Sequence, residues 1–132
     1  MNNENLEPIW LDSELLLAVH EMLLARYGGS TGIREKNLLE SELDRPKNLF
    51  IYEQKGIFDL AASYAEGITN NHPFIDGNKR SACMSAILFL ETNGYFFEAS
   101  EESAVEMVLG LSTKKISRDD FARWLKDFSK KS

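Results

Sequence analysis

One stretch of nine residues holds more chemically versatile side chains than any other part of the chain. It combines an imidazole, a carboxylate, a carboxamide and two adjacent cations in the run His72-Pro73-Phe74-Ile75-Asp76-Gly77-Asn78-Lys79-Arg80. An imidazole titrates near neutral pH and is the usual general base, whereas a carboxylate is a ligand that Mg²⁺ takes together with substrate phosphates. The combination indicates nucleotide-dependent transfer of a group to a hydroxyl.

Two apolar segments flank this run and predict how it is positioned. Residues 58–68 and 82–90 are apolar on more than one face, which predicts two buried helices. The run is then a polar loop that leads into the start of the second helix, where unpaired N–H groups and the helix dipole suit an anion. Lys79 and Arg80 lie at that end, where a helix by itself prefers acids, so they indicate an external anion.

The same residues also have ordinary structural explanations. Asp-Gly is a frequent turn pair, and Asp or Asn before an apolar run is the usual helix N-cap. Two adjacent cations can serve solubility alone, and His72 before a proline can simply bond a backbone group. Spacing alone therefore leaves a phosphate site and a plain helix start as alternatives.

The run resembles the signature of the Fic/Doc superfamily, and most closely that of its death-on-curing branch, the Doc-like toxins of type II toxin–antitoxin pairs. The general signature, His-Pro-Phe-x-Asp/Glu-Gly-Asn-Gly-Arg, is matched from position 72 through position 78. Lys79 then stands where nucleotidyl-transferring relatives have glycine, as in Doc-like proteins, whereas Pro73 and Gly77 depart from the best-known Doc pattern. Blocks at residues 28–46 and 89–95 extend the resemblance over most of the chain.

The resemblance implies an all-α fold, a compact single-domain bundle of about six helices over residues 1–132 with a short β flap as an option. In relatives a flap holds the target's backbone by strand addition, and residues 46–56 occupy that region. Phe50, Ile51 and Tyr52 would form its exposed edge. The alternative is a loop that two aromatic side chains fix to the core.

Roles for the signature residues follow from the same resemblance. His72 is the expected catalytic base, Asp76 the expected Mg²⁺ ligand, and ATP the expected nucleotide. Phe74 is expected to insert into the core and fix the loop. Gly77 is expected to let the backbone approach the phosphate. The expected nucleotide-phosphate site consists of Gly77, Asn78, Lys79 and Arg80.

Lys79 bears on the type of transfer. A long cation there occupies the space that receives the α-phosphate in nucleotidyl transferases, and Doc-like relatives place the γ-phosphate of ATP at the reactive position. The resemblance therefore implies a toxin that phosphorylates a Ser or Thr hydroxyl of a translation factor and arrests translation. Elongation factor Tu is the established target of the family.

Two rival interpretations stay open. One is AMP transfer to a protein hydroxyl, because Pro73 and Gly77 match the nucleotidyl-transferring signature. The other is a non-catalytic module that only binds a nucleotide or an antitoxin. The self-inhibiting helix of some relatives, Ser/Thr-x-x-x-Glu-Gly/Asn, is not matched, since residues 31–36 fail at the last position and residues 63–67 are one residue short. Inhibition is therefore expected in trans, from an antitoxin segment that folds into a groove.

Length, charge and cysteine content bound the class of protein. A chain of 132 residues fits one domain, and a net charge of −6 argues against direct nucleic-acid binding. The single cysteine, Cys83, suits a reducing compartment. There is no basic, apolar leader and no apolar run of about 18 residues. These features predict a cytoplasmic protein without a membrane segment, and the family resemblance implies that it is bacterial.

Local signals predict the remaining elements. Helices are expected over residues 13–27 with Asp12 or Ser13 as the cap, over residues 35–44 ahead of Pro46, and over residues 101–111 after Ser100.

A last helix is expected after Ser117, with an apolar stripe that reaches Phe128 and with lysines 126, 130 and 131 at its C-terminal end. Residues 95–97 are expected to be extended and residues 1–8 loosely ordered. His20 is expected to lie on the surface or to be satisfied internally, without a catalytic role.

Overall fold

The computed structural model describes residues 6–132, so most of the segment predicted to be loosely ordered lies outside the described residues. The described chain forms six helices and two short strands, which confirms the predicted all-α class. None of these helices in residues 6–132 is long and apolar enough to cross a membrane. In chain order the elements are α1 (Ser13–Tyr27), α2 (Lys36–Glu53), α3 (Ile57–Asn71), α4 (Asn78–Thr92), β1 (Tyr95–Phe97), α5 (Glu101–Ser112), α6 (Arg118–Asp127) and β2 (Ser129–Lys131).

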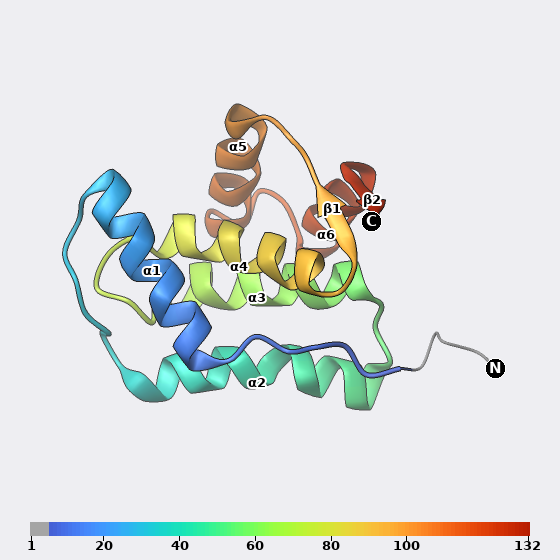
Figure 1. The fold of residues 1–132 in the computed structure, drawn as a ribbon, viewed down its shortest axis with the longest axis horizontal. Coiled ribbons are helices and arrows are strands. Elements are labelled where there is room, and N and C mark those ends of the chain that lie inside the picture. Colours follow the sequence, from blue (N-terminus) through green and yellow to red (C-terminus); the bar gives the residue numbers. More distant parts are fainter. Residues whose placement is uncertain (1–5) are drawn as a thin grey trace.

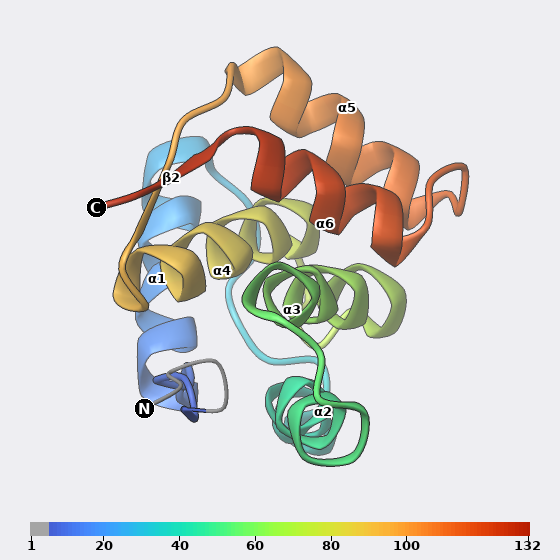
Figure 2. The same cartoon turned by 90° about the vertical axis from the view of Figure 1, so that its right-hand side faces the viewer.

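Helix α3 is the centre of the fold. Figure 1 shows α3 and α4 side by side, and Figure 2, which looks nearly along α3, shows α2 on one side of it and α6 on the other. Because neighbours surround α3, its buried side chains are not confined to one face, as the sequence predicted. They are Leu60, Ala61, Ala62, Ser63, Tyr64, Ala65, Ile68 and Thr69.

Side-chain caps begin three of the helices, as predicted. Asp12 caps α1, Ser100 caps α5 and Ser117 caps α6, each by accepting a hydrogen bond from a backbone N–H in the first turn. These bonds replace the partners that the first N–H groups of a helix lack. Helix α4 begins without such a cap, at Gly77.

The predicted end of α2 ahead of Pro46 is wrong, because α2 continues through Pro46 to Glu53. A proline inside a helix removes one hydrogen bond and costs about 3 kcal/mol. Burial offsets this cost, since Leu39, Leu43, Pro46 and Leu49 form one continuous buried stripe against α3. The residues predicted to form an extended flap edge, 50–52, are therefore helical.

The short sheet of this fold lies elsewhere. Strand β1 forms at residues 95–97 as predicted, and it pairs antiparallel with β2, with Tyr95 opposite Lys131 and Phe97 opposite Ser129. Helix α6 consequently ends at Asp127, and Phe128 is its half-exposed C-cap rather than part of a buried stripe. The lysines at positions 130 and 131 belong to β2, which corrects the prediction that they extend the last helix.

Candidate active site

Residues 72–77 of the run form the connection between α3 and α4, and residues 78–80 form the first turn of α4, as predicted. His72 is the C-cap of α3 in the left-handed conformation (φ 50°, ψ 61°), and the residue is exposed. A left-handed backbone costs a residue with a side chain about 1–2 kcal/mol, so neighbouring contacts must hold it. The connection is therefore a constrained turn that presents an imidazole to solvent.

Phe74 inserts into the core and fixes this turn, as expected. Its side chain is fully buried, and its ring stacks on that of His20 with centroids 3.8 Å apart and planes 7° apart. The Nε2 atom of His20 lies 2.7 Å from the carbonyl oxygen of Asp76, and because a carbonyl only accepts, Nε2 carries the proton and donates. His20 is thus buried and internally satisfied, and it supports the turn from α1.

A second segment, residues 30–35, runs along the turn, and we call it the strap. Ile33 and Phe74 form an isolated antiparallel bridge, and the backbone N–H of Arg34 donates to the carbonyl of Pro73 at 2.7 Å. Figure 1 shows the connection between α1 and α2 beside the connection between α3 and α4. Part of the upstream block that resembles the family therefore lies against the signature.

The side chain of Arg34 closes the C-terminal end of α3. Its Nε donates to the carbonyl of His72 at 2.8 Å, and its Nη2 donates to the carbonyl of Asn71 at 2.6 Å. The last carbonyls of a helix lack helical partners and carry its negative pole, so a cation is favourable there. No local sequence signal predicts these bonds, because they join positions 37 and 38 residues apart.

The carboxylate of Asp76 is exposed but held by the backbone. Its Oδ2 accepts from the N–H of Ser30 at 3.1 Å and its Oδ1 from the N–H of Gly77 at 2.8 Å. These two bonds, in that order, and the nearby Arg80 keep the pKa of Asp76 below its usual value of 3.8. Because its pKa is lowered, the carboxylate is charged at neutral pH. Each oxygen also retains a free lone pair, so the group fits the role of a Mg²⁺ ligand.

Two residues of the predicted phosphate site have structural roles in the turn. The buried side chain of Asn78 accepts from the N–H of Phe74 and donates to the carbonyl of the same residue, both at 3.0 Å. These two bonds hold the side chain on the turn, whereas the backbone N–H of Asn78 lies in the first turn of α4. Gly77 has φ +76°, and a Cβ there would point toward Leu24 and His20 at 3.4–3.5 Å. The left-handed backbone conformation by itself favours glycine at this position.

The first turn of α4 is open and cationic. It has no capping side chain and no acid, and Lys79 and Arg80 are both exposed. The guanidinium of Arg80 lies over the ring of Tyr27 at 4.4 Å from its centroid, which orients it at the end of α1. Unpaired N–H groups, the positive helix pole and two cations thus converge beside Asp76.

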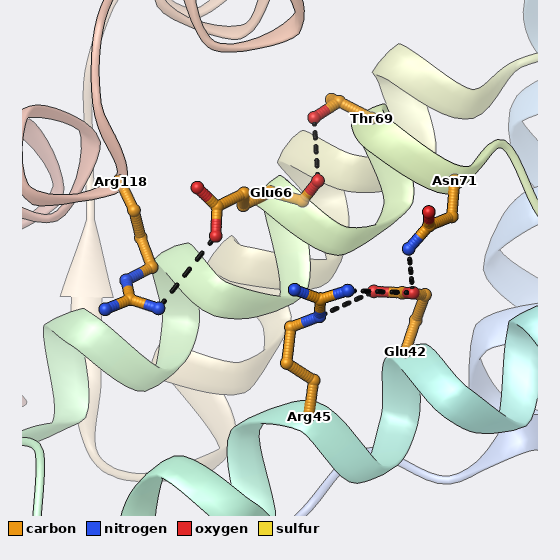
Figure 3. A network of polar contacts seen from close by, with 6 residues as sticks. All are labelled: Glu42, Arg45, Glu66, Thr69, Asn71 and Arg118. Atoms are coloured by element: carbon orange, nitrogen blue, oxygen red, sulfur yellow. Dashed lines mark hydrogen bonds and ion pairs between the residues drawn. The ribbon is translucent and has the colours of Figure 1, made fainter. Parts of the chain in front are cut away.

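A buried polar network holds the other side of the turn. Figure 3 shows Glu42 of α2 between Arg45 and Asn71, and the Glu42 side chain is only 1% exposed. Arg45 Nε donates to Glu42 at 3.1 Å, and the amide of Asn71 donates to the same carboxylate. Gly67 makes room for it, because a Cβ there would lie 1.6 Å from Glu42 Oε2. Asn71, next to His72, is therefore fixed from α2.

The structure does not bring the predicted flap residues to this site. Phe50, Ile51 and Tyr52 lie in the last turn of α2, at the end of α3 opposite His72 (Figure 1). Ile51 and Tyr52 are exposed, and Tyr52 lines a cavity of about 380 Å³ together with Arg118. These three residues are helical and far from the signature turn because α2 continues through Pro46.

Helical architecture and a signature turn at the start of a core helix define the class of protein. The Fic/DOC family model matches residues 10–90, and the chain belongs to that family. The chain is 33% identical over 117 residues to the protein kinase doc of Escherichia phage P1, which covers 88% of this chain and 92% of that relative. It is 27% identical over 124 residues to the toxin Doc of Mycolicibacterium smegmatis, covering 91% and 93%.

Proposed function

We propose that this protein is the toxin of a toxin–antitoxin pair and that it transfers the γ-phosphoryl group of ATP to a Ser or Thr hydroxyl of a target protein. The names of the two relatives, a protein kinase and a toxin, support this proposal. The observation that carries it is the uncapped start of α4, where Lys79 and Arg80 replace the acids that a helix prefers.

Each signature residue has a role in this reaction. His72 is exposed beside the open helix start and takes the proton of the target hydroxyl, an effect typically worth about 10²–10⁴ in rate. The N–H groups of the first turn of α4, together with Lys79 and Arg80, bind the nucleotide phosphates and neutralise the charge that develops during transfer. Asp76 would hold Mg²⁺, which when bound neutralises phosphate charge.

The choice between phosphoryl and AMP transfer depends on Lys79. Its long side chain stands at the first turn of α4, in the position that is glycine in the nucleotidyl-transferring signature. We infer that this cation excludes the α-phosphate from the reactive position and directs the γ-phosphate there. The second candidate, AMP transfer, is favoured by Pro73 and Gly77, which match the nucleotidyl-transferring pattern.

The partners of this activity are an antitoxin and a translation factor. We propose elongation factor Tu as the target, from family resemblance, and a trans-acting antitoxin as the inhibitor, because the self-inhibiting sequence pattern is not matched. The expected compartment is the bacterial cytoplasm, where the target is found. Nucleic acid has no direct part in this reaction.

Labelled ATP tests the proposal. The protein, Mg²⁺ and either γ-labelled or α-labelled ATP are incubated with purified elongation factor Tu or with a bacterial lysate. We expect transfer of the γ-label only, lost in His72→Ala and kept in Lys126→Ala, an exposed residue of α6 that serves as the control. Transfer of the α-label instead would support AMP transfer and overturn the assignment of Lys79. Growth arrest that persists in His72→Ala would favour a binding module.

A further inference from the structure

The backbone on both sides of His72 is held more tightly than an exposed turn requires. His72 is in the left-handed conformation, and three consecutive carbonyls at this point, those of Asn71, His72 and Pro73, all accept hydrogen bonds from the same residue, Arg34. The side chain of Arg34 bonds the first two and its backbone N–H bonds the third. One residue of the strap therefore fixes the peptide units on both sides of the imidazole.

The planar guanidinium of Arg34, with its forked N–H donors, suits two neighbouring carbonyls because of its shape. A guanidinium is planar and carries several N–H donors in a rigid arrangement, so it can bond two carbonyls of one turn at once. The two distances, 2.8 Å to His72 and 2.6 Å to Asn71, show that both bonds form together. A lysine would keep the charge but present a single ammonium, which cannot reproduce the planar fork.

Arg34 is itself held in place by the strap. The bridge between Ile33 and Phe74 and the bond from the N–H of Ile75 to the carbonyl of Gly32, at 3.1 Å, hold the two residues before Arg34 against the signature turn. The fork consequently approaches from a fixed backbone, although the residue is exposed.

A second contact fixes the same point from the opposite side. The side chain of Asn71 donates to the buried carboxylate of Glu42, which Arg45 also bonds (Figure 3). Asn71 is thus held through its side chain by α2 and through its carbonyl by the strap. With the residue before it fixed twice, His72 has little freedom to move away from the start of α4.

We infer that Arg34 is a positioning residue for the reaction, which acts by holding the backbone of residues 71–73 so that the His72 imidazole faces the phosphate site. This inference rests on the proposed function, because it assigns Arg34 a part in the step that His72 performs. Arg34 does not bind the nucleotide in this scheme, so its loss lowers kcat and leaves KM for ATP nearly unchanged. A misplacement of about 1 Å can cost on the order of 10²-fold in rate.

The test compares Arg34→Gln and Arg34→Lys with Arg123→Gln, a control that removes an exposed arginine of α6. We expect Arg34→Gln to lower kcat for γ-phosphoryl transfer by about 10–10²-fold, with KM for ATP within about twofold of the wild type. Arg34→Lys should recover part of the loss, and Arg123→Gln should match the wild type. A kcat within twofold of the wild type in Arg34→Gln would overturn the inference, as would a loss confined to KM.

Amide hydrogen exchange provides a readout that does not depend on activity. In Arg34→Gln the amides of His72 and Ile75 should exchange at least about tenfold faster, while amides of the α3 core keep their protection. If the wild type transfers no phosphoryl group, the proposed function fails, yet faster exchange of these amides would still show that Arg34 holds the backbone of residues 71–73. Unchanged exchange would overturn the inference even in an active enzyme. If Arg34→Gln does not fold, the same comparison is made with Arg34→Lys.

Discussion

Helices α4 and α6 begin in opposite ways. Helix α6 starts with a capping box, in which the hydroxyl of Ser117 accepts from the N–H of Asp120 at 3.1 Å and the carboxylate of Asp120 accepts from the N–H of Ser117 at 3.0 Å. Asp119 adds a second acid to that turn. Helix α4 starts at Gly77 with neither a capping side chain nor an acid, and its first turn carries Lys79 and Arg80.

The difference separates a helix start that completes itself from one that needs a partner. In α6 the chain supplies both the acceptor for the free N–H groups and the negative charge that the helix dipole favours. In α4 the chain supplies more positive charge at the same pole, and the nearest carboxylate, that of Asp76, is bound to backbone N–H groups just outside the helix. We therefore expect α4 to take an anion from solution.

The largest expected effect comes from making α4 resemble α6. Lys79→Glu places an acid in the first turn of α4. Its interaction with the helix dipole stabilises the folded protein by about 0.3–1 kcal/mol, but its charge repels the nucleotide phosphates. We expect phosphoryl transfer to fall by at least about 10²-fold, as when one transition-state donor is lost, while the free energy of unfolding stays equal or rises. Rates of γ-label transfer and urea denaturation measure the two quantities.

A matched control exists at the start of α2, where Lys36 is exposed in the first helical turn. Lys36→Glu should give the same small change in stability without loss of transfer. Retention of more than a tenth of the wild-type rate in Lys79→Glu would contradict the assignment of the phosphate site to α4.

The next effect concerns the residue that begins α4. Gly77→Ala puts a side chain on a backbone with φ +76°, so we expect the free energy of unfolding to fall by about 1–2 kcal/mol. Gly56, the N-cap of α3, has φ −79° and open space around it, so Gly56→Ala should be neutral or slightly stabilising. Urea denaturation of both variants measures the difference, and equal effects would contradict a conformational role for Gly77.

Much of this contrast could be predicted from the sequence because its signals are local. The caps at Asp12, Ser100 and Ser117 follow from side chains that lie three residues from the N–H groups they bond. The two core helices follow from their apolar runs, and the charge pattern after Gly77 is the basis for the prediction that α4 binds an anion.

The contacts that complete the site could not be predicted because they depend on tertiary packing. His20 bonds the carbonyl of Asp76 across 56 positions, and no sequence pattern near either residue predicts the contact. Helix α2 passes through Pro46 because burial against α3 outweighs the lost hydrogen bond, so a reliable local rule failed there. The same failure produced the incorrect flap.

A smaller effect should follow from loss of the cap on α6. Ser117→Ala removes the hydroxyl that accepts from the N–H of Asp120, and such a change costs about 1 kcal/mol. We expect the midpoint of urea denaturation to fall while the rate of γ-label transfer per folded molecule stays at the wild-type value. A loss of rate beyond the loss of folded protein would contradict the view that this helix start is purely structural.

The smallest effect, and the finest comparison, concerns the two aspartates. The backbone N–H of Ser30 and then that of Gly77 lower the pKa of Asp76, and the backbone and then the side chain of Ser117 lower the pKa of Asp120. A carboxyl whose folded-state pKa is lowered stabilises the protein above its unfolded pKa of about 3.9, and this contribution is lost as the pH falls through the folded value.

Asp76→Asn and Asp120→Asn should therefore be less stable than the wild type near pH 7, and the difference should shrink below about pH 4, where the wild-type carboxyls take up their protons. Urea denaturation across this pH range measures it. Added ATP and Mg²⁺ separate the two sites, since they should stabilise Asp120→Asn as much as the wild type and Asp76→Asn clearly less. Equal stabilisation of both variants would mean that Asp76 only holds the strap and binds no metal. The proposed phosphate site at α4 would then keep its cations but have no metal ligand at Asp76.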